Sequence, residues 1–104
     1  MVYLPEVYKG FKKHFPKIAD SYDKLAVNCN EGGPLDEPTR ELVRLGIAIG
    51  MSAEGSIRSH ARRALAAGVS PESIRHAVLL ALTTAGFPTT IAALKWVDEV
   101  LDKQ

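Results

Sequence analysis

The sequence predicts an all-α fold of about six helices, and three observations lead to this. No segment shows the sustained apolar–polar alternation of a half-buried strand. Apolar residues instead recur at helical spacing, as Ile91, Leu94 and Val97 do near the C-terminus. Prolines, capping residues and glycines cut the chain into segments of helix length. At 104 residues the chain has the size of one domain, so we expect a single domain over residues 1–104.

Prolines and a glycine-rich break delimit the first two helices. Pro5 and Pro16 suit the first turns of helices over roughly 4–14 and 16–30, because the N–H that proline lacks is not needed there. The stretch NEGGP then interrupts the helical pattern. We therefore expect two short helices before residue 31.

Capping residues mark the remaining helices. Asp36 can cap a third helix that includes TRELVRLGIAIG, which is apolar around most of its circumference. A fourth helix is expected from about 53 to 67, with Gly68 as its left-handed stop. Ser70 caps a fifth segment, SPESIRHAVLLALTTAG, and FPTTIAALKWVDEVLDKQ forms the sixth.

Composition narrows the classes of partner and compartment. A net charge of +1 gives no basic excess, so we expect no nucleic-acid partner. Charges interrupt every window of the roughly 20 residues that a membrane helix needs, so we expect no membrane span. The single cysteine, Cys29, suits a reducing compartment, so we expect a cytoplasmic protein in which this thiol is a small apolar residue rather than a nucleophile.

A histidine and a glutamate on neighbouring helices are the first candidate site. The third and fourth helices are joined by a few residues near 50–53, so they should be antiparallel neighbours. The helical rise then places Glu41 and His60 level with each other. His60 shares the inward stripe of its helix with Ile57 and Ala61, whereas Glu41 lies at the flank of its own stripe and can turn either way.

Two interpretations of this pair stay open on residue types alone. In one, the carboxylate fixes the tautomer of the imidazole and provides a proton donor or base that works near neutral pH. In the other, His60 is a packed core residue, and Glu41 pairs with Arg44 or Arg40 on its own helix.

At these residues the sequence resembles a known family. The stretch ELVRLGIAIGMSAEGSIRSHARRALAAGVSPESIRHAVLLA is similar to the carboxymuconolactone decarboxylase family, which shares the all-helical fold of the alkylhydroperoxidase D-like (AhpD-like) proteins. The likeness extends from LPEVYKGF to GFPTTIAALKWVDEV. It implies a compact, oligomerising helical domain that assembles as a trimer or hexamer.

The resemblance also identifies a departure from the peroxidase branch of that superfamily. That branch has a glutamate, a C-x-x-C and a histidine four residues after the second cysteine. Glu41 and His60 match the glutamate and the histidine, but Ala53 and Ser56 occupy the cysteine positions. Disulfide-forming peroxide reduction needs an attacking thiolate and a resolving thiol. Alkylhydroperoxidase activity is therefore the least favoured alternative.

The activity that the resemblance implies is decarboxylation of a small carboxylated lactone from aromatic-compound breakdown, and it needs no cofactor. In this interpretation His60 is the acid, and Glu41 orients it. Ser56 would donate a hydrogen bond to the anionic substrate, and Arg58 or Arg62 would hold a carboxylate. No two histidines have the spacing of a helical metal site, so we expect no metal.

The alternative is a protein without catalytic activity that uses the same scaffold to bind a small ligand or a partner. Family membership describes the scaffold, whereas function depends on the site. The third helix, which starts after Asp36, and the fifth, over SPESIRHAVLLALTTAG, are apolar around most of their circumference. In so short a chain this indicates that other subunits of a homo-oligomer cover part of them.

Overall fold

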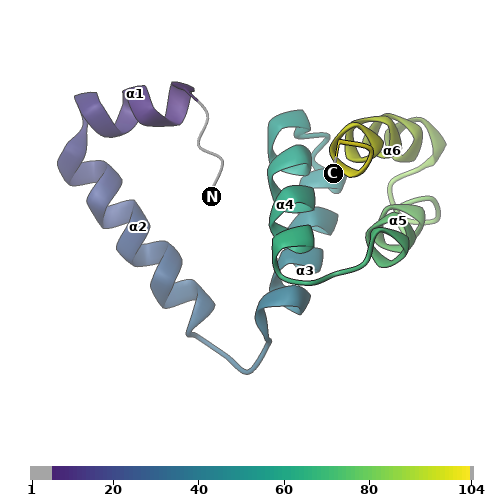
Figure 1. Cartoon of the computed structure of the whole chain (residues 1–104), viewed down its shortest axis with the longest axis horizontal. Helices are drawn as coiled ribbons and strands as arrows, with labels where there is room; N and C mark the ends of the chain where they lie inside the picture. Colours follow the sequence, from purple (N-terminus) through teal and green to yellow (C-terminus); the bar gives the residue numbers. More distant parts are fainter. Residues whose placement is uncertain (1–5, 104) are drawn as a thin grey trace. The chain divides into compact units, whose positions relative to one another are not determined.

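The computed structural model describes residues 6–103 and separates into two compact units, Met1–Pro34 and Leu35–Gln104. Within residues 6–103 there are six helices and no strand (Figure 1). The predicted all-α fold is thus confirmed. None of these helices is both long and apolar enough to cross a membrane.

The first unit is a helical hairpin. Helix α1 (Glu6–His14) packs on α2 (Pro16–Asn30), and α2 begins at its proline as the sequence predicts. The hydroxyl of Tyr8 donates to Oδ1 of Asp23 at 2.8 Å, which joins the two helices. The expected start of the first helix at residue 4 lies outside the described residues.

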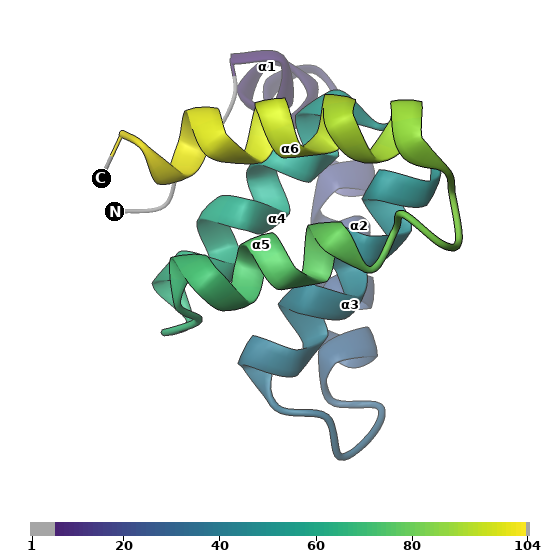
Figure 2. The same ribbon diagram turned by 90° about the vertical axis from the view of Figure 1, so that its right-hand side faces the viewer.

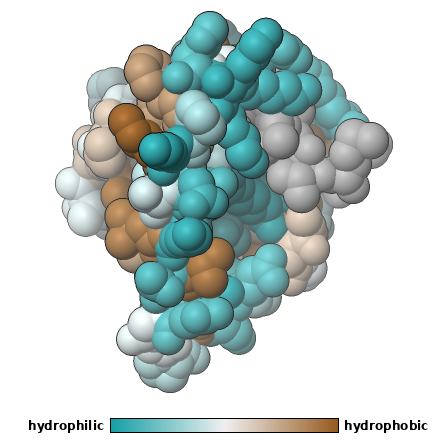
Figure 3. Space-filling view, turned by 90° about the vertical axis from the view of Figure 1, so that its left-hand side faces the viewer, coloured by the Kyte–Doolittle hydropathy of each residue, from teal (hydrophilic) through white to brown (hydrophobic). Residues whose placement is uncertain are grey.

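Most large apolar side chains of the first unit are exposed. Ala19 is its one buried residue among those described. Residues with exposed apolar side chains are Val7, Phe11, Phe15, Ile18, Tyr22, Leu25 and Val27. Figure 3 shows surface of this kind, in brown, beside polar surface on one face of the molecule. Two helices offer too little interior to bury these side chains.

The second unit holds the hydrophobic core. It consists of α3 (Glu37–Gly50), α4 (Glu54–Ala66), α5 (Pro71–Leu79) and α6 (Phe87–Leu101). Helix α4 packs against α3 and against α6, and α5 packs on α3 and α6 (Figures 1 and 2). The largest fully buried side chains are Leu45, Ile49, Ile57, Ile74, Val78 and Val97.

The predicted caps are present. The Asp36 carboxylate accepts a hydrogen bond from the Thr39 backbone N–H at 3.0 Å at the start of α3. Bonds from the Thr39 side chain and backbone hold the pKa of Asp36 below its ordinary value. Ser70 caps α5 in the same way, and Gly68 adopts φ +93° after α4.

The connection between α3 and α4 is a tight turn of three residues. The Ala53 N–H donates to the carbonyl of Ala48 at 3.0 Å. Ser52 has φ +52°, a left-handed conformation that few non-glycine residues adopt. This turn makes α3 and α4 antiparallel neighbours, as predicted, and it sets the level of His60 relative to α3.

Helix α5 is shorter than the sequence pattern predicts. It ends at Leu79, and residues 80–85 form turns. The N–H of Leu82 bonds to the carbonyl of Leu79, three residues back, at 3.0 Å, and the Thr84 hydroxyl donates to the Leu80 carbonyl at 2.7 Å. The first bond tightens the backbone beyond the α-helical repeat, and the second gives a backbone carbonyl a side-chain partner. The apolar residues of this turn thus lie outside a regular helix.

The inward stripe of α6 differs in part from the sequence pattern. Val97 and Leu101 are buried, but Ile91 is 46% exposed. Thr90 is buried in its place, since its hydroxyl donates to the Gly86 carbonyl at 2.8 Å. A local side-chain-to-backbone bond makes burial of a threonine possible here.

Candidate functional site

A carboxylate–imidazole pair joins α3 to α4. Nδ1 of His60 lies 2.8 Å from Oε1 of Glu41. The side chain of Glu41 is 9% exposed and that of His60 is 15% exposed. Glu41 therefore turns inward, which the sequence left open, and the two residues are brought together across the hairpin.

Glu41 also has a partner on its own helix. Nη1 of Arg44 lies 3.5 Å from Oε2 of Glu41, so the two carboxylate oxygens contact different helices. Arg40 does not take part, because its Nη1 donates to the Leu35 carbonyl at 2.6 Å. The contact with His60 and the contact with Arg44, which the sequence offered as alternatives, are therefore both present. A carboxylate this buried needs such partners to offset its lost hydration.

The geometry determines which imidazole nitrogen is left for chemistry. When Glu41 is ionised it accepts from the Nδ1–H of His60, so Nε2 is the nitrogen that can exchange a proton with a substrate. A carboxylate in this position holds the orientation of the imidazole ring. The arrangement is suited to proton transfer at Nε2.

Ser56 lies one turn before His60, on the same side of α4, and is half-buried. The Ala53 N–H is already bonded to a backbone carbonyl. The N–H groups of the first turn, residues 54–56, are those for which a helix itself has no carbonyl partner. The position of Ser56 is compatible with a substrate contact, which stays a prediction.

The two predicted arginines lie on the other side of α4. Nε and Nη2 of Arg58 contact Oε2 of Glu99 at 3.2 and 2.8 Å, and its Nη1 contacts Glu54. Hydrogen bonds to Glu54 and Glu99 raise the pKa of Arg58, and the Arg58 guanidinium lowers the pKa of Glu99. The Arg58 guanidinium also lies 6.0 Å from the ring centre of Trp96.

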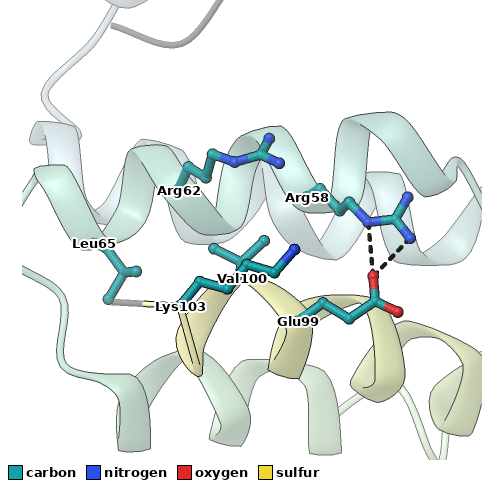
Figure 4. Close-up of a pocket in the computed structure, with 6 residues that line it drawn as sticks. All are labelled: Arg58, Arg62, Leu65, Glu99, Val100 and Lys103. Carbon is teal, nitrogen blue, oxygen red and sulfur yellow. Dashed lines mark hydrogen bonds and ion pairs between the residues drawn. The ribbon is translucent and has the colours of Figure 1, made fainter. Parts of the chain in front are cut away.

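Two cavities of the second unit are not lined by the Glu41–His60 pair. One, of about 360 Å³, has Arg58 and Arg62 in its lining (Figure 4). The other, of about 670 Å³, is an apolar groove formed by α3, α5 and the turns after α5. Arg58 and Arg62 are thus grouped with each other and not with His60.

Sequence reasoning named Arg44 only as the alternative partner of Glu41, from their spacing of three residues, and not as a partner that holds Glu41 together with His60. Cys29 is exposed on α2, where an apolar packing role was expected. Among residues 6–103, no three His, Cys, Asp or Glu side chains are grouped closely enough to hold a metal ion.

Curated proteins similar to this chain include three from different organisms. An uncharacterised protein of Haemophilus influenzae is 38% identical over 52 residues, half of this chain and 46% of its own length. An uncharacterised protein of Methanocaldococcus jannaschii is 27% identical over 100 residues, which is 95% of this chain and 96% of its own length.

The third relative carries a functional name. A nitrosuccinic acid decarboxylase of Metarhizium robertsii is 37% identical over 73 residues, 66% of this chain and 51% of its own length. The chain thus spans about half the length of two of the three relatives. No solved structure matches the chain.

The characteristic sequence of one family covers most of the chain. The match extends over residues 16–99 and so includes α2 to α5 and most of α6. Both members of the carboxylate–imidazole pair lie inside it. This protein belongs to the carboxymuconolactone decarboxylase family.

Proposed function

We propose that this protein is a cofactor-free decarboxylase of a small carboxylated substrate, with His60 as the proton donor. The observation that carries the proposal is the 2.8 Å contact between His60 Nδ1 and Glu41 Oε1. Family membership supports the reaction class, as does the name of the Metarhizium relative. The specific substrate we propose is a carboxylated lactone of the kind that gives the family its name.

The chemistry needs no group beyond the substrate and this chain. The bond between the substrate carbon and its carboxylate breaks, CO2 leaves, and the electron pair moves into a conjugated carbonyl of the substrate. His60 Nε2–H then gives its proton to a carbon of the resulting enolate, and the imidazole regains a proton from water, whose hydroxide combines with the released CO2 as bicarbonate. Glu41 accepts from Nδ1–H throughout and holds the ring, while Arg44 holds Glu41.

Substitution of the two histidines of the second unit tests this proposal. His76 is exposed on α5, so His76→Gln matches His60→Gln in chemistry but lies outside the pair. We expect purified protein to release CO2 from 4-carboxymuconolactone. The reaction is measured as loss of the substrate and as CO2 trapped in the form of carbonate. His60→Gln should lower kcat/KM by about 100-fold or more, the usual contribution of a positioned general acid, and His76→Gln should leave it unchanged.

The same assay with nitrosuccinate as substrate separates the reaction class from the substrate. Release of CO2 from nitrosuccinate alone would retain the decarboxylase and replace the lactone. Equal rates with and without protein on both compounds would contradict the proposed activity, as would an equal rate for wild type and His60→Gln.

A second candidate role is supported by the apolar groove of the second unit. No charged side chain of the described residues lines it, and several apolar residues beside or within it are exposed. These are Val43, Ile47, Leu79, Leu80 and Leu82. An uncharged surface of this kind is typical of a permanent contact between subunits. We propose that a second copy of this chain covers the groove, in a trimer or a hexamer.

Two aspartate substitutions within one turn test the assembly. Leu80 lines the groove and is 61% exposed, whereas Thr83 is exposed in the same run of turns and does not line it. In light scattering coupled to gel filtration, we expect wild type and Thr83→Asp to be oligomeric and Leu80→Asp to be smaller, because an interface does not accommodate an unpaired carboxylate. A monomeric wild type, or an unchanged Leu80→Asp, would refute this contact.

A further inference from the structure

The cavity between α4 and the end of α6 has an apolar floor and charged walls. Leu65 and Val100 form the floor, and Arg58, Arg62, Glu99 and Lys103 form the walls. Figure 4 shows the two arginines extending from α4, and Glu99, Val100 and Lys103 extending from α6 and the turn at its end. Its volume of about 360 Å³ lies in the range of small-molecule sites. We call this cavity the cationic cleft.

Cationic side chains outnumber anionic ones among the described residues that line the cationic cleft. Three of these side chains are cationic and one is anionic, which gives a net charge of +2 for the described lining. Glu54, which contacts Arg58 from outside the cleft, reduces this excess to +1. A positive wall above an apolar floor attracts an anion that has a hydrocarbon body.

The side chain of Glu99 is itself a carboxylate bound by an arginine of the cleft, Arg58. Its Oε2 accepts from both Nε and Nη2 of Arg58, and the resulting attraction lowers the pKa of Glu99. Arg62 and Lys103 are the other two cationic side chains among the described residues of the lining. They come from α4 and from the end of α6 respectively, so they approach a bound anion from two helices.

The cationic cleft is separate from the Glu41–His60 pair. Arg58 and Arg62 each lie two residues from His60, which is a rotation of roughly 160° around the helix. The buried residues Ile57, Ala61 and Ala64 occupy the face between them. A ligand in the cleft therefore cannot contact His60 directly.

We propose that the cationic cleft binds a short-chain organic carboxylate at a site distinct from the proton-transfer pair. Arg62 and Lys103 contact its carboxylate groups, and Leu65 and Val100 contact its hydrocarbon part. The apolar floor favours such an anion over inorganic phosphate, which has no surface to bury there. The inference rests on the cleft alone and does not depend on the proposed decarboxylation.

Glutarate is a suitable probe, with neutral glutaramide and inorganic phosphate as comparisons. Trp96 is the one tryptophan of the chain and lies against Arg58, so its fluorescence reports on the cleft. Amide shifts of uniformly ¹⁵N-labelled protein give a second readout. We expect glutarate to cause saturable shifts in residues 62–65 and 99–103, and we expect glutaramide and phosphate to bind more weakly.

Two adjacent arginines provide a matched pair of variants. Arg62 lines the cleft, whereas Arg63 is exposed on the same helix and does not. Arg62→Gln should weaken glutarate binding by about tenfold, the effect of losing one charge-assisted hydrogen bond. Arg63→Gln should bind as wild type does, and so should His60→Gln, even if that variant is catalytically inactive.

Four results would overturn the proposal. One is the absence of saturable shifts in both readouts. The second is equal binding of glutarate and glutaramide, which would remove the role of charge. The third is equal weakening by Arg62→Gln and Arg63→Gln, which would indicate a general surface-charge effect. Stronger binding of phosphate than of glutarate would replace the organic carboxylate by a simple anion and would also contradict the inference.

Discussion

The two sides of α4 each connect it to a neighbouring helix through a carboxylate, but in different environments. On one side, His60 contacts Glu41 of α3, and these side chains are 15% and 9% exposed. On the other, Arg58 contacts Glu99 of α6, and these are 26% and 39% exposed. A similar polar contact is thus nearly enclosed on one side and open to solvent on the other.

The difference in burial separates the roles that the two contacts can have. An enclosed carboxylate has lost most of its hydration, so it depends on His60 and Arg44 for compensation. It is therefore fixed in one geometry, as proton transfer requires. The carboxylate of Glu99 keeps part of its hydration, and an anion in solution can compete for the same cations. The enclosed side is suited to chemistry and the open side to reversible binding.

The largest expected effect on stability comes from removing the carboxylate on each side of α4. Glu41→Ala leaves the Nδ1 group of His60 without its partner at a nearly enclosed site. We expect it to lower the free energy of unfolding by about 1–3 kcal/mol, measured by urea denaturation. Glu99→Ala should lower it less, because Arg58 keeps Glu54 as a partner and part of its hydration.

The isosteric variant Glu41→Gln serves as the control, since its side-chain oxygen still accepts a hydrogen bond from Nδ1–H. It should recover part of the stability that Glu41→Ala loses. If Glu99→Ala destabilises the protein as much as Glu41→Ala does, burial does not distinguish the two sides of α4.

Most of the fold could be predicted from the sequence because its signals are local. Asp36, Ser70 and Gly68 act within one turn of their own positions, so they mark helix ends without knowledge of the tertiary structure. The end of α5 was missed because LLALTTAG continues a helical pattern, while the Thr84 hydroxyl bonds to the backbone one turn earlier.

The site could be predicted only in part, because its geometry depends on contacts between helices. The hairpin and the helical rise predicted that Glu41 and His60 lie at the same height along neighbouring helices. They did not predict the orientation of Glu41, because its carboxylate can pair with His60 on α4 or with Arg44 on its own helix. The pairing of Arg58 with Glu99 spans 41 residues, and no local spacing indicates it. Lys103 was missed for the same reason.

The smallest expected effect is the change that Glu99 makes to the pH dependence of the unfolding free energy. The pKa of Glu99 is lowered by Arg58 from an ordinary value of 4.5. A carboxylate whose pKa is lower in the folded state stabilises the protein above its unfolded-state pKa, and this contribution is lost as the pH falls through the folded-state pKa. The unfolding free energy of wild type should therefore decrease below about pH 4.5 more steeply than that of Glu99→Gln. In an Arg58→Gln background, Glu99→Gln should change the slope less, because the largest cause of the lowered pKa is gone and only the weaker attraction of Lys95 and Lys103 is left. An unchanged effect of Glu99→Gln in that background would show that Arg58 is not the cause.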